Sequence, residues 1–161
     1  MFKVGDMAVY PSQGVGIVEA IESRDIGGSV NNFYVLRIVD NDMTIMIPVN
    51  NVAQVGLRTL IDRGRISSVY KLLEEKLSEI PATISWSRRQ REYNDKIKSG
   101  DLFEVAEVLR ELYMIKEGKE LSYGEKKVLE LARRLLVKEL ALAQGQAEDM
   151  VVKRVENIFI N

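Results

Sequence analysis

The sequence predicts an α+β protein of two domains, a small SH3-like or Tudor-like β-barrel followed by a compact all-α bundle. Residues 1–56 contain short apolar runs with a period of two, which is typical of strands with one buried face. From about residue 57, apolar residues recur at spacings of three and four, which is typical of amphipathic helices. The charge also changes there: residues 1–56 hold three basic and six acidic side chains, and residues 57–161 hold twenty and eighteen. We therefore predict domains at 1–56 and 57–161 that have different partners.

The first domain is expected to contain four or five short strands. Apolar residues alternate with other residues in 15–21 and in 33–39, and a short apolar run at 45–47 ends at Pro48. Proline has no backbone N–H to donate to a neighbouring strand, so we expect the strand to end there. The glycines at 14–16 predict a hairpin turn. They do not fit a dinucleotide-binding loop, because the residues that follow continue as a strand and no third glycine opens a helix.

The second domain is expected to contain five helices with short links between them. The predicted helices cover residues 67–76, 85–98, 101–118, a long segment from 122, and 148–159. Two starts carry capping-box patterns, Asp101 with Glu104 and Ser122 with Glu125. A break with Pro81 is expected at 78–83.

Composition excludes several kinds of chemistry. The 161 residues include no Cys and no His, which removes thiol nucleophiles, imidazole bases and the usual zinc, iron and copper ligands. The carboxylates are spread over helix faces with no pair singled out for acid–base work, so we expect no enzyme and no cofactor. There is no secretory signal and no apolar run of membrane-spanning length, which predicts a soluble cytoplasmic protein.

The segment 85–91 is the strongest functional feature. It contains the single tryptophan, Trp86, followed within five residues by three arginines: Arg88, Arg89 and Arg91. An aromatic wedge beside guanidinium groups suits a protein that grips a nucleic-acid backbone and disturbs base stacking. Trp86 also shares a helical stripe with Tyr93 and Ile97, which is the pattern of a residue packed in a core. The residues alone leave both interpretations open.

Two helical segments carry excess positive charge. Residues 86–98 and residues 124–138 each contain five basic and two acidic side chains, a net charge of +3. If the helix starts near Trp86 and Lys126 lie side by side, they form one positive surface that favours phosphate.

Segments along the whole chain match one known family when they are taken in order. The matching segments are 2–6, 9–11, 13–16, 34–38, 45–48, 86–89, 100–101, 105–110 and 121–126. On these segments the chain resembles the CarD/CdnL family of bacterial transcription regulators. It lacks the long basic extension of some CarD proteins, so it is similar to the shorter CdnL type.

The resemblance implies that the barrel binds RNA polymerase. The barrel is similar to the polymerase-interacting module of transcription-repair coupling factors, which implies contact with the β1 lobe of the β subunit. By position, Arg24, Met46 and Pro48 fall on the polymerase-facing surface. Some family members have arginine at the position of Met46, so the contact expected here is apolar.

The resemblance also implies a DNA contact by the helical domain. This domain would touch DNA at the upstream edge of the melted promoter and stabilise the open complex. Trp86 would be the wedge in the minor groove, and the implied phosphate contacts are Arg88, Arg89, Arg91 and Lys126. The DNA affinity would be weak and largely independent of sequence.

Other functions remain open from the residues alone. In a protein–protein adaptor, the arginines would be solvated and DNA would not protect Trp86. An RNA-binding SH3-like factor would prefer structured RNA to a forked duplex. A carboxylate-based hydrolase would require a deep pocket with paired Asp or Glu.

Overall fold

The computed structural model describes residues 1–75 and 85–160, so the expected break at 78–83 lies outside the described residues. The chain forms two compact units, Met1–Leu60 and Ile61–Asn161. The boundary follows Leu60 because the chain stays with the sheet as far as Arg58. The amide of Val9 donates to the carbonyl of Arg58 at 2.7 Å, and Leu57 is buried in the core of the sheet unit.

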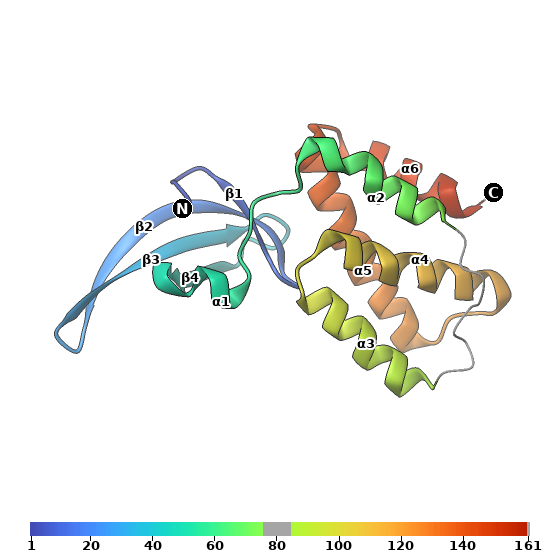
Figure 1. Cartoon of the computed structure of the whole chain (residues 1–161), viewed down its shortest axis with the longest axis horizontal. Coiled ribbons are helices and arrows are strands. Elements are labelled where there is room, and N and C mark those ends of the chain that lie inside the picture. The colour runs from blue at the N-terminus through green and yellow to red at the C-terminus, as the bar shows by residue number, and fades with distance from the viewer. Residues whose placement is uncertain (76–84, 161) are drawn as a thin grey trace. The chain divides into compact units, whose positions relative to one another are not determined.

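The N-terminal unit is a curled antiparallel sheet, a half-barrel whose strands follow one another in chain order (Figure 1). The strands are β1 Met7–Tyr10, β2 Gly14–Ile26, β3 Ser29–Ile38 and β4 Thr44–Pro48. Strands β1 and β4 are the edges of the sheet. A 3₁₀ turn, η1 Val49–Asn51, and a short helix, α1 Val52–Val55, follow β4.

One face of this sheet is the core. Val18, Leu36 and Ile38 are fully buried there, and Gly16 is needed beside them because a Cβ at its position would lie 2.6 Å from Cγ of Leu36. A bulge between Val18 and Ala20 interrupts the alternation expected in 15–21. After the bulge, the residues of β2 face the side of the sheet opposite to the one expected from the alternation, and Ile21 is exposed.

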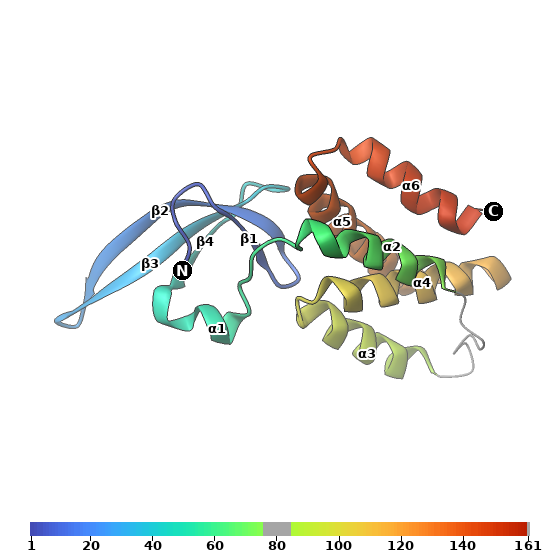
Figure 2. The same ribbon diagram turned by 45° about the horizontal axis from the view of Figure 1, so that its top comes forward.

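Among its described residues, the second unit is built of helices joined by short links (Figure 2). A 3₁₀ turn, η2 Arg63–Arg65, leads into α2 Ile66–Glu74, and the remaining helices are α3 Trp86–Lys98, α4 Leu102–Gly118, α5 Tyr123–Gln144 and α6 Glu148–Ile160. Helices α2, α3 and α5 all pack on α4, while α6 packs on α5 and α2. The predicted α+β class, with a small β domain before a helical bundle, is confirmed.

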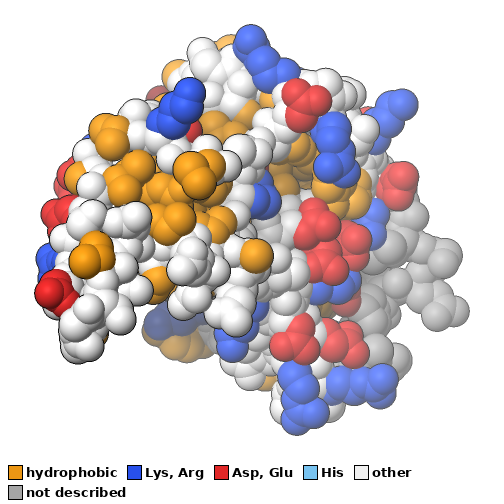
Figure 3. Space-filling model, turned by 60° about the vertical axis from the view of Figure 1, so that its left-hand side comes forward, with side chains coloured by type: hydrophobic (Ala, Val, Ile, Leu, Met, Phe, Trp, Pro, Cys, Tyr) orange, Lys and Arg blue, Asp and Glu red, His pale blue; other side chains and the backbone are white. Residues whose placement is uncertain are grey.

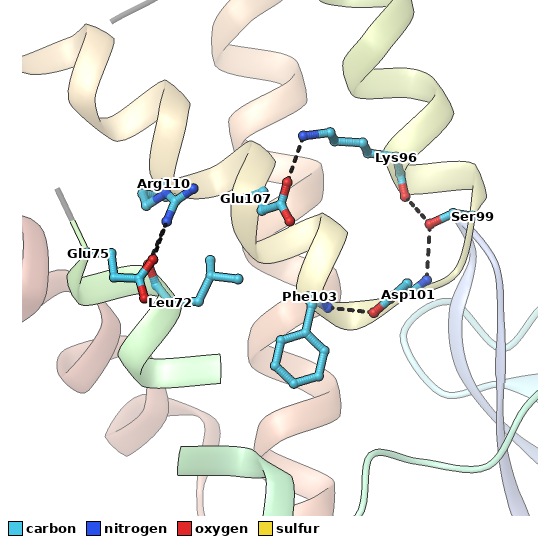
Figure 4. Close-up of polar contacts among 8 residues, drawn as sticks. All are labelled: Leu72, Glu75, Lys96, Ser99, Asp101, Phe103, Glu107 and Arg110. Carbon is cyan, nitrogen blue, oxygen red and sulfur yellow. Dashed lines mark hydrogen bonds and ion pairs between the residues drawn. The ribbon is translucent and has the colours of Figure 1, made fainter. Parts of the chain in front are cut away.

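Side-chain bonds mark the helix starts that the sequence predicts. The Ser122–Glu125 capping box is present at the start of α5. At the start of α4, the carboxylate of Asp101 accepts from the amide of Phe103 at 2.9 Å (Figure 4). These caps satisfy amide groups that have no partner inside their own helix.

Polar bonds also tie α4 to two neighbouring helices. Lys96 of α3 donates to Glu107 at 2.8 Å, and Arg110 donates to the carbonyl of Leu72 in α2 at 3.0 Å (Figure 4). Both bonds fix the position of α3 and α2 on the bundle. Across residues 1–75 and 85–160, no helix has both the length and the apolar character needed to cross a bilayer.

Candidate nucleic-acid and protein interfaces

Trp86 is the first residue of α3 and lies against the first turn of α5. Its indole ring is 6.1 Å from the ring of Tyr93, measured between centroids. A Cβ at Gly124 would lie 3.1 Å from the indole Nε1, so the ring packs closely on the α5 backbone at this glycine. Trp86 remains half-buried. It is therefore anchored on the bundle, as the packing interpretation predicts, and part of its surface remains exposed. Its role as a wedge in nucleic acid stays a prediction.

The starts of α3 and α5 lie side by side, as the positive-surface hypothesis requires. Besides the contact of Trp86 with Gly124, the guanidinium of Arg89 lies 3.1 Å from the carboxylate of Glu125. We call Trp86, Arg88, Arg91 and Lys126 the helix-start surface.

The basic side chains of the helix-start surface are available to a ligand. Arg88 is 70% exposed and lies 3.6 Å from Glu92, and Lys126 is 54% exposed and lies 3.9 Å from Glu120. Arg91 is also exposed. Ion pairs of this kind on a surface contribute about 0–1 kcal/mol, so a phosphate can displace them.

Arg89 does not belong to this surface, which corrects its expected role as a phosphate contact. The residue is 4% exposed, its guanidinium pairs with Glu125, and it lies 5.2 Å from the ring of Trp86. It therefore supports Trp86 from inside the bundle. Its spacing from Trp86, Tyr93 and Ile97 places it on their stripe, and this signal in the sequence would have predicted its burial.

Glu125 is the buried partner of that arginine. It accepts from the amide of Ser122 at 2.9 Å and lies 3.5 Å from the ammonium of Lys119. Burial alone would raise the pKa of Glu125, but hydrogen bonds from Ser122 and Arg89 and the charge of Lys119 outweigh it and lower the pKa to about 2. The carboxylate is thus ionised and neutralised inside the bundle, and it does not repel an anion at the surface.

The three residues expected to face polymerase share the outer face of the sheet. Strand pairing places Met46 opposite Val35 and Pro48 opposite Phe33. Arg24 of β2 pairs with Asn31 of β3. Asn31 lies two residues before Phe33 and therefore on the same face of β3, so Arg24 also lies on this outer face.

Ile47 is buried in the core, so Met46 points to the opposite face, as its alternation predicts. Phe33 and Val35 extend the apolar surface beside Met46 and are only half-buried. Figure 3, with the N-terminal unit turned forward, shows hydrophobic side chains gathered on one face of that unit. Neither Phe33 nor Val35 was singled out from the sequence, although the alternation in 33–39 already places them on one face.

Two family models match the chain. The model of the CarD C-terminal domain matches residues 68–156, and the model described as CarD-like/TRCF RID domain matches residues 2–61. The chain belongs to the CarD family.

Individual relatives agree with the family models. "Putative transcription factor YdeB" of Bacillus subtilis (strain 168) is 34% identical over 151 residues, which cover 94% of this chain and 97% of the relative. Among solved structures, "CdnLNt" from Myxococcus xanthus is 57% identical, with 38% of this chain and 86% of that chain covered and a TM-score of 0.33. The N-terminal domain of Myxococcus xanthus CarD is 34% identical, with 37% and 79% covered and a TM-score of 0.32. The two family models and the relative from Bacillus subtilis show that the chain is a transcription regulator of the CarD family.

The helical unit of this CarD-family chain also has a cavity of about 910 Å³ between the C-terminal end of α4, α5 and α6. Its wall contains carboxylates that pair with basic side chains: Glu156 lies 3.1 Å from Arg133, and Glu120 lies 3.9 Å from Lys126. These two carboxylates are neutralised by neighbouring cations, which does not favour a role in proton transfer. Within the described ranges, acidic side chains nowhere cluster in a group suited to a metal ion.

Proposed function

We propose that this CarD-family regulator binds the β subunit of RNA polymerase with the outer face of its sheet and stabilises the promoter open complex with its helix-start surface. The observation that carries the proposal is the arrangement of Trp86. It is anchored on Gly124 and half-buried, at the place where the starts of α3 and α5 meet, and both of these helix starts carry exposed cations. The activity belongs to the cytoplasm, where transcription takes place in bacteria.

The polymerase contact is supported by the sheet unit. Residues 2–61 match the domain that CarD proteins share with transcription-repair coupling factors. Met46 and Pro48 lie on β4, an edge strand that has free backbone groups for a strand of the β1 lobe. Arg24 is exposed on the same face of the sheet, where it pairs with Glu22 at 3.2 Å.

The DNA contact follows from the chemistry of the helix-start surface. An aromatic ring that stacks on a base contributes about 1–3 kcal/mol, and about 1.4 kcal/mol shifts an equilibrium tenfold. Trp86 alone is therefore sufficient to bias the open state at the upstream edge of the bubble. Arg88, Arg91 and Lys126 would hold the backbone beside it without reading sequence.

Such a weak contact depends on the tether. Three phosphate contacts and one stacked ring give low affinity for free DNA at physiological salt. Binding to polymerase raises the local concentration of the helical unit at the promoter to the millimolar range. Each unit therefore needs the other for the effect, although each makes its own contact.

The test is the lifetime of open complexes after a competitor is added. Polymerase on a promoter fragment is challenged with heparin in the presence of wild-type protein, Trp86→Ala or Met46→Asp. We expect wild type to lengthen the lifetime and both variants to lose the effect, with only Trp86→Ala still co-eluting with polymerase. A wild-type protein that co-elutes without changing the lifetime would favour the plain adaptor, and a preference for structured RNA over a forked duplex would favour the RNA-binding alternative.

A further inference from the structure

Tyr123 is an exposed aromatic residue that the proposed function has not yet used. It is the first residue of α5, directly after the capping residue Ser122, and it is 74% exposed. Among the described residues of the helical unit, its only counterpart as a large exposed apolar side chain is Met150, at 60%. Tyrosine is enriched at interfaces because its ring offers an apolar contact surface and its hydroxyl can form a hydrogen bond.

The ring of Tyr123 is paired with a cation. The ammonium of Lys127, one turn further along α5, lies 4.9 Å from the ring centroid. This cation–π contact restrains both side chains on the surface. An aromatic ring beside an ammonium group matches a nucleotide, in which a flat base lies next to a phosphate.

Tyr123 also borders the turn on which Trp86 packs. The next residue is Gly124, and the indole Nε1 of Trp86 lies 3.1 Å from the position of a Cβ there. The charged side chains exposed on this turn are both positive, Lys126 and Lys127, because Glu125 is buried against Arg89. One exposed aromatic residue and two lysines therefore share the turn of α5 on which Trp86 packs.

We propose that Tyr123 is a second base-stacking residue of the helix-start surface and that Lys127 contacts the neighbouring phosphate. The partner is DNA with unpaired bases at a junction between duplex and single strand. Inside a duplex the faces of each base are covered by its neighbours, so an aromatic side chain gains a stacking partner only where bases are unpaired or unstacked. This inference rests on the proposed DNA contact and deepens it, because it assigns Tyr123 a preference for the melted strand.

The experiment compares two DNA probes with the full-length protein. One probe is a forked duplex with unpaired arms, and the other is the fully paired duplex of the same length, both labelled for fluorescence anisotropy at low salt. We expect Tyr123→Ala to weaken binding of the fork about tenfold, as loss of one stacked base does, and to change binding of the paired duplex less than about twofold. Tyr123→Phe keeps the ring and should bind the fork like wild type.

Two further variants separate stacking from charge and from surface exposure. Lys127→Ala should lower the log–log salt slope of binding by about 0.9, whereas Tyr123→Ala should leave that slope unchanged. Met150→Ala removes the other exposed apolar side chain of the helical unit and should bind both probes like wild type. Thermal melting of Tyr123→Ala should superimpose on wild type, because the side chain is exposed.

The outcomes distinguish this inference from the proposed function. If Trp86→Ala weakens binding of the fork and Tyr123→Ala does not, the role of Tyr123 is overturned and the DNA contact stands. Equal losses of Tyr123→Ala on both probes would also overturn it, because stacking on unpaired bases is then not the cause. If wild type shows no saturable binding to the fork, or if neither aromatic variant changes that binding, the DNA contact itself fails and the role of Tyr123 fails with it.

Discussion

Arg89 and Glu125 form a buried ion pair between α3 and α5, with Nη1 and Oε2 separated by 3.1 Å and the residues 4% and 1% exposed. The two residues are thirty-six positions apart in the chain. The pair holds the start of α3 against the start of α5 and thereby sets the position of Trp86, whose ring lies over the same arginine. A charged pair inside the bundle thus positions the aromatic residue at its surface.

Removing one member of this pair should destabilise the helical unit strongly. Arg89→Met leaves the carboxylate of Glu125 buried without its guanidinium, which costs about 3 kcal/mol. Urea denaturation followed by circular dichroism measures the loss. Arg88→Met, the same change at the neighbouring exposed position, should cost less than about 0.5 kcal/mol. Similar losses of unfolding free energy in the two variants would show that the buried ion pair does not make the expected contribution to stability.

The low pKa of Glu125 predicts how stability depends on pH. The ordinary pKa is 4.5 and the folded value is about 2, so the unfolded chain binds a proton at this site before the folded chain does. The stabilisation by Glu125 is complete above about pH 4.5 and is lost as the pH falls from there towards 2. Glu125→Gln should therefore flatten the dependence of the unfolding free energy on pH in this interval. Gln90→Ala, an exposed change on α3 that titrates nothing, should keep the slope of wild type.

Replacing the tryptophan should separate the two contacts. Trp86→Ala should abolish the lengthening of open-complex lifetime and leave co-elution with polymerase intact. Since the ring is only half-buried, its loss should cost about 1–2 kcal/mol of stability, below the 3–5 kcal/mol typical of a fully buried tryptophan. A cost in that higher range together with an unchanged lifetime would assign Trp86 to the core alone.

The outer face of the sheet has its own matched pair of variants. Met46→Asp places a charge at the centre of the proposed apolar contact and should abolish co-elution with polymerase without changing the melting curve. Met43→Asp makes the same change just before β4, at an exposed methionine, and should keep binding. Loss of binding in both variants would point to general repulsion by negative charge, and retention in both would place the polymerase contact elsewhere.

The parts of the structure that local chemistry determines were predictable from sequence. The starts of α4 and α5 follow the caps at Asp101 and Ser122, because a cap acts within four residues. The outward direction of Met46 follows from the alternation of a strand that ends at Pro48. In each case the decisive residues lie next to one another in the chain.

Features set by distant partners were not predictable in this way. The spacing of Arg89 places it on the buried stripe of α3, but its partner Glu125 lies thirty-six positions further along the chain, and nothing in the sequence around Arg89 identifies that partner. The bulge after Val18 that exposes Ile21 depends on the register with β3. The boundary after Leu60 depends on the pairing of Arg58 with Val9.

The corrected helix-start surface predicts a definite salt dependence. If Arg88, Arg91 and Lys126 each neutralise one phosphate, these three side chains should together contribute about −3 to the log–log salt slope for binding of the full chain to a forked duplex. Each alanine variant should reduce that slope by about one and should weaken binding to unrelated sequences equally. Trp86→Ala should lower the affinity but leave the salt slope unchanged, since stacking releases no counterions. If all three cation variants show the salt slope of wild type, these side chains are solvated and do not contact phosphates.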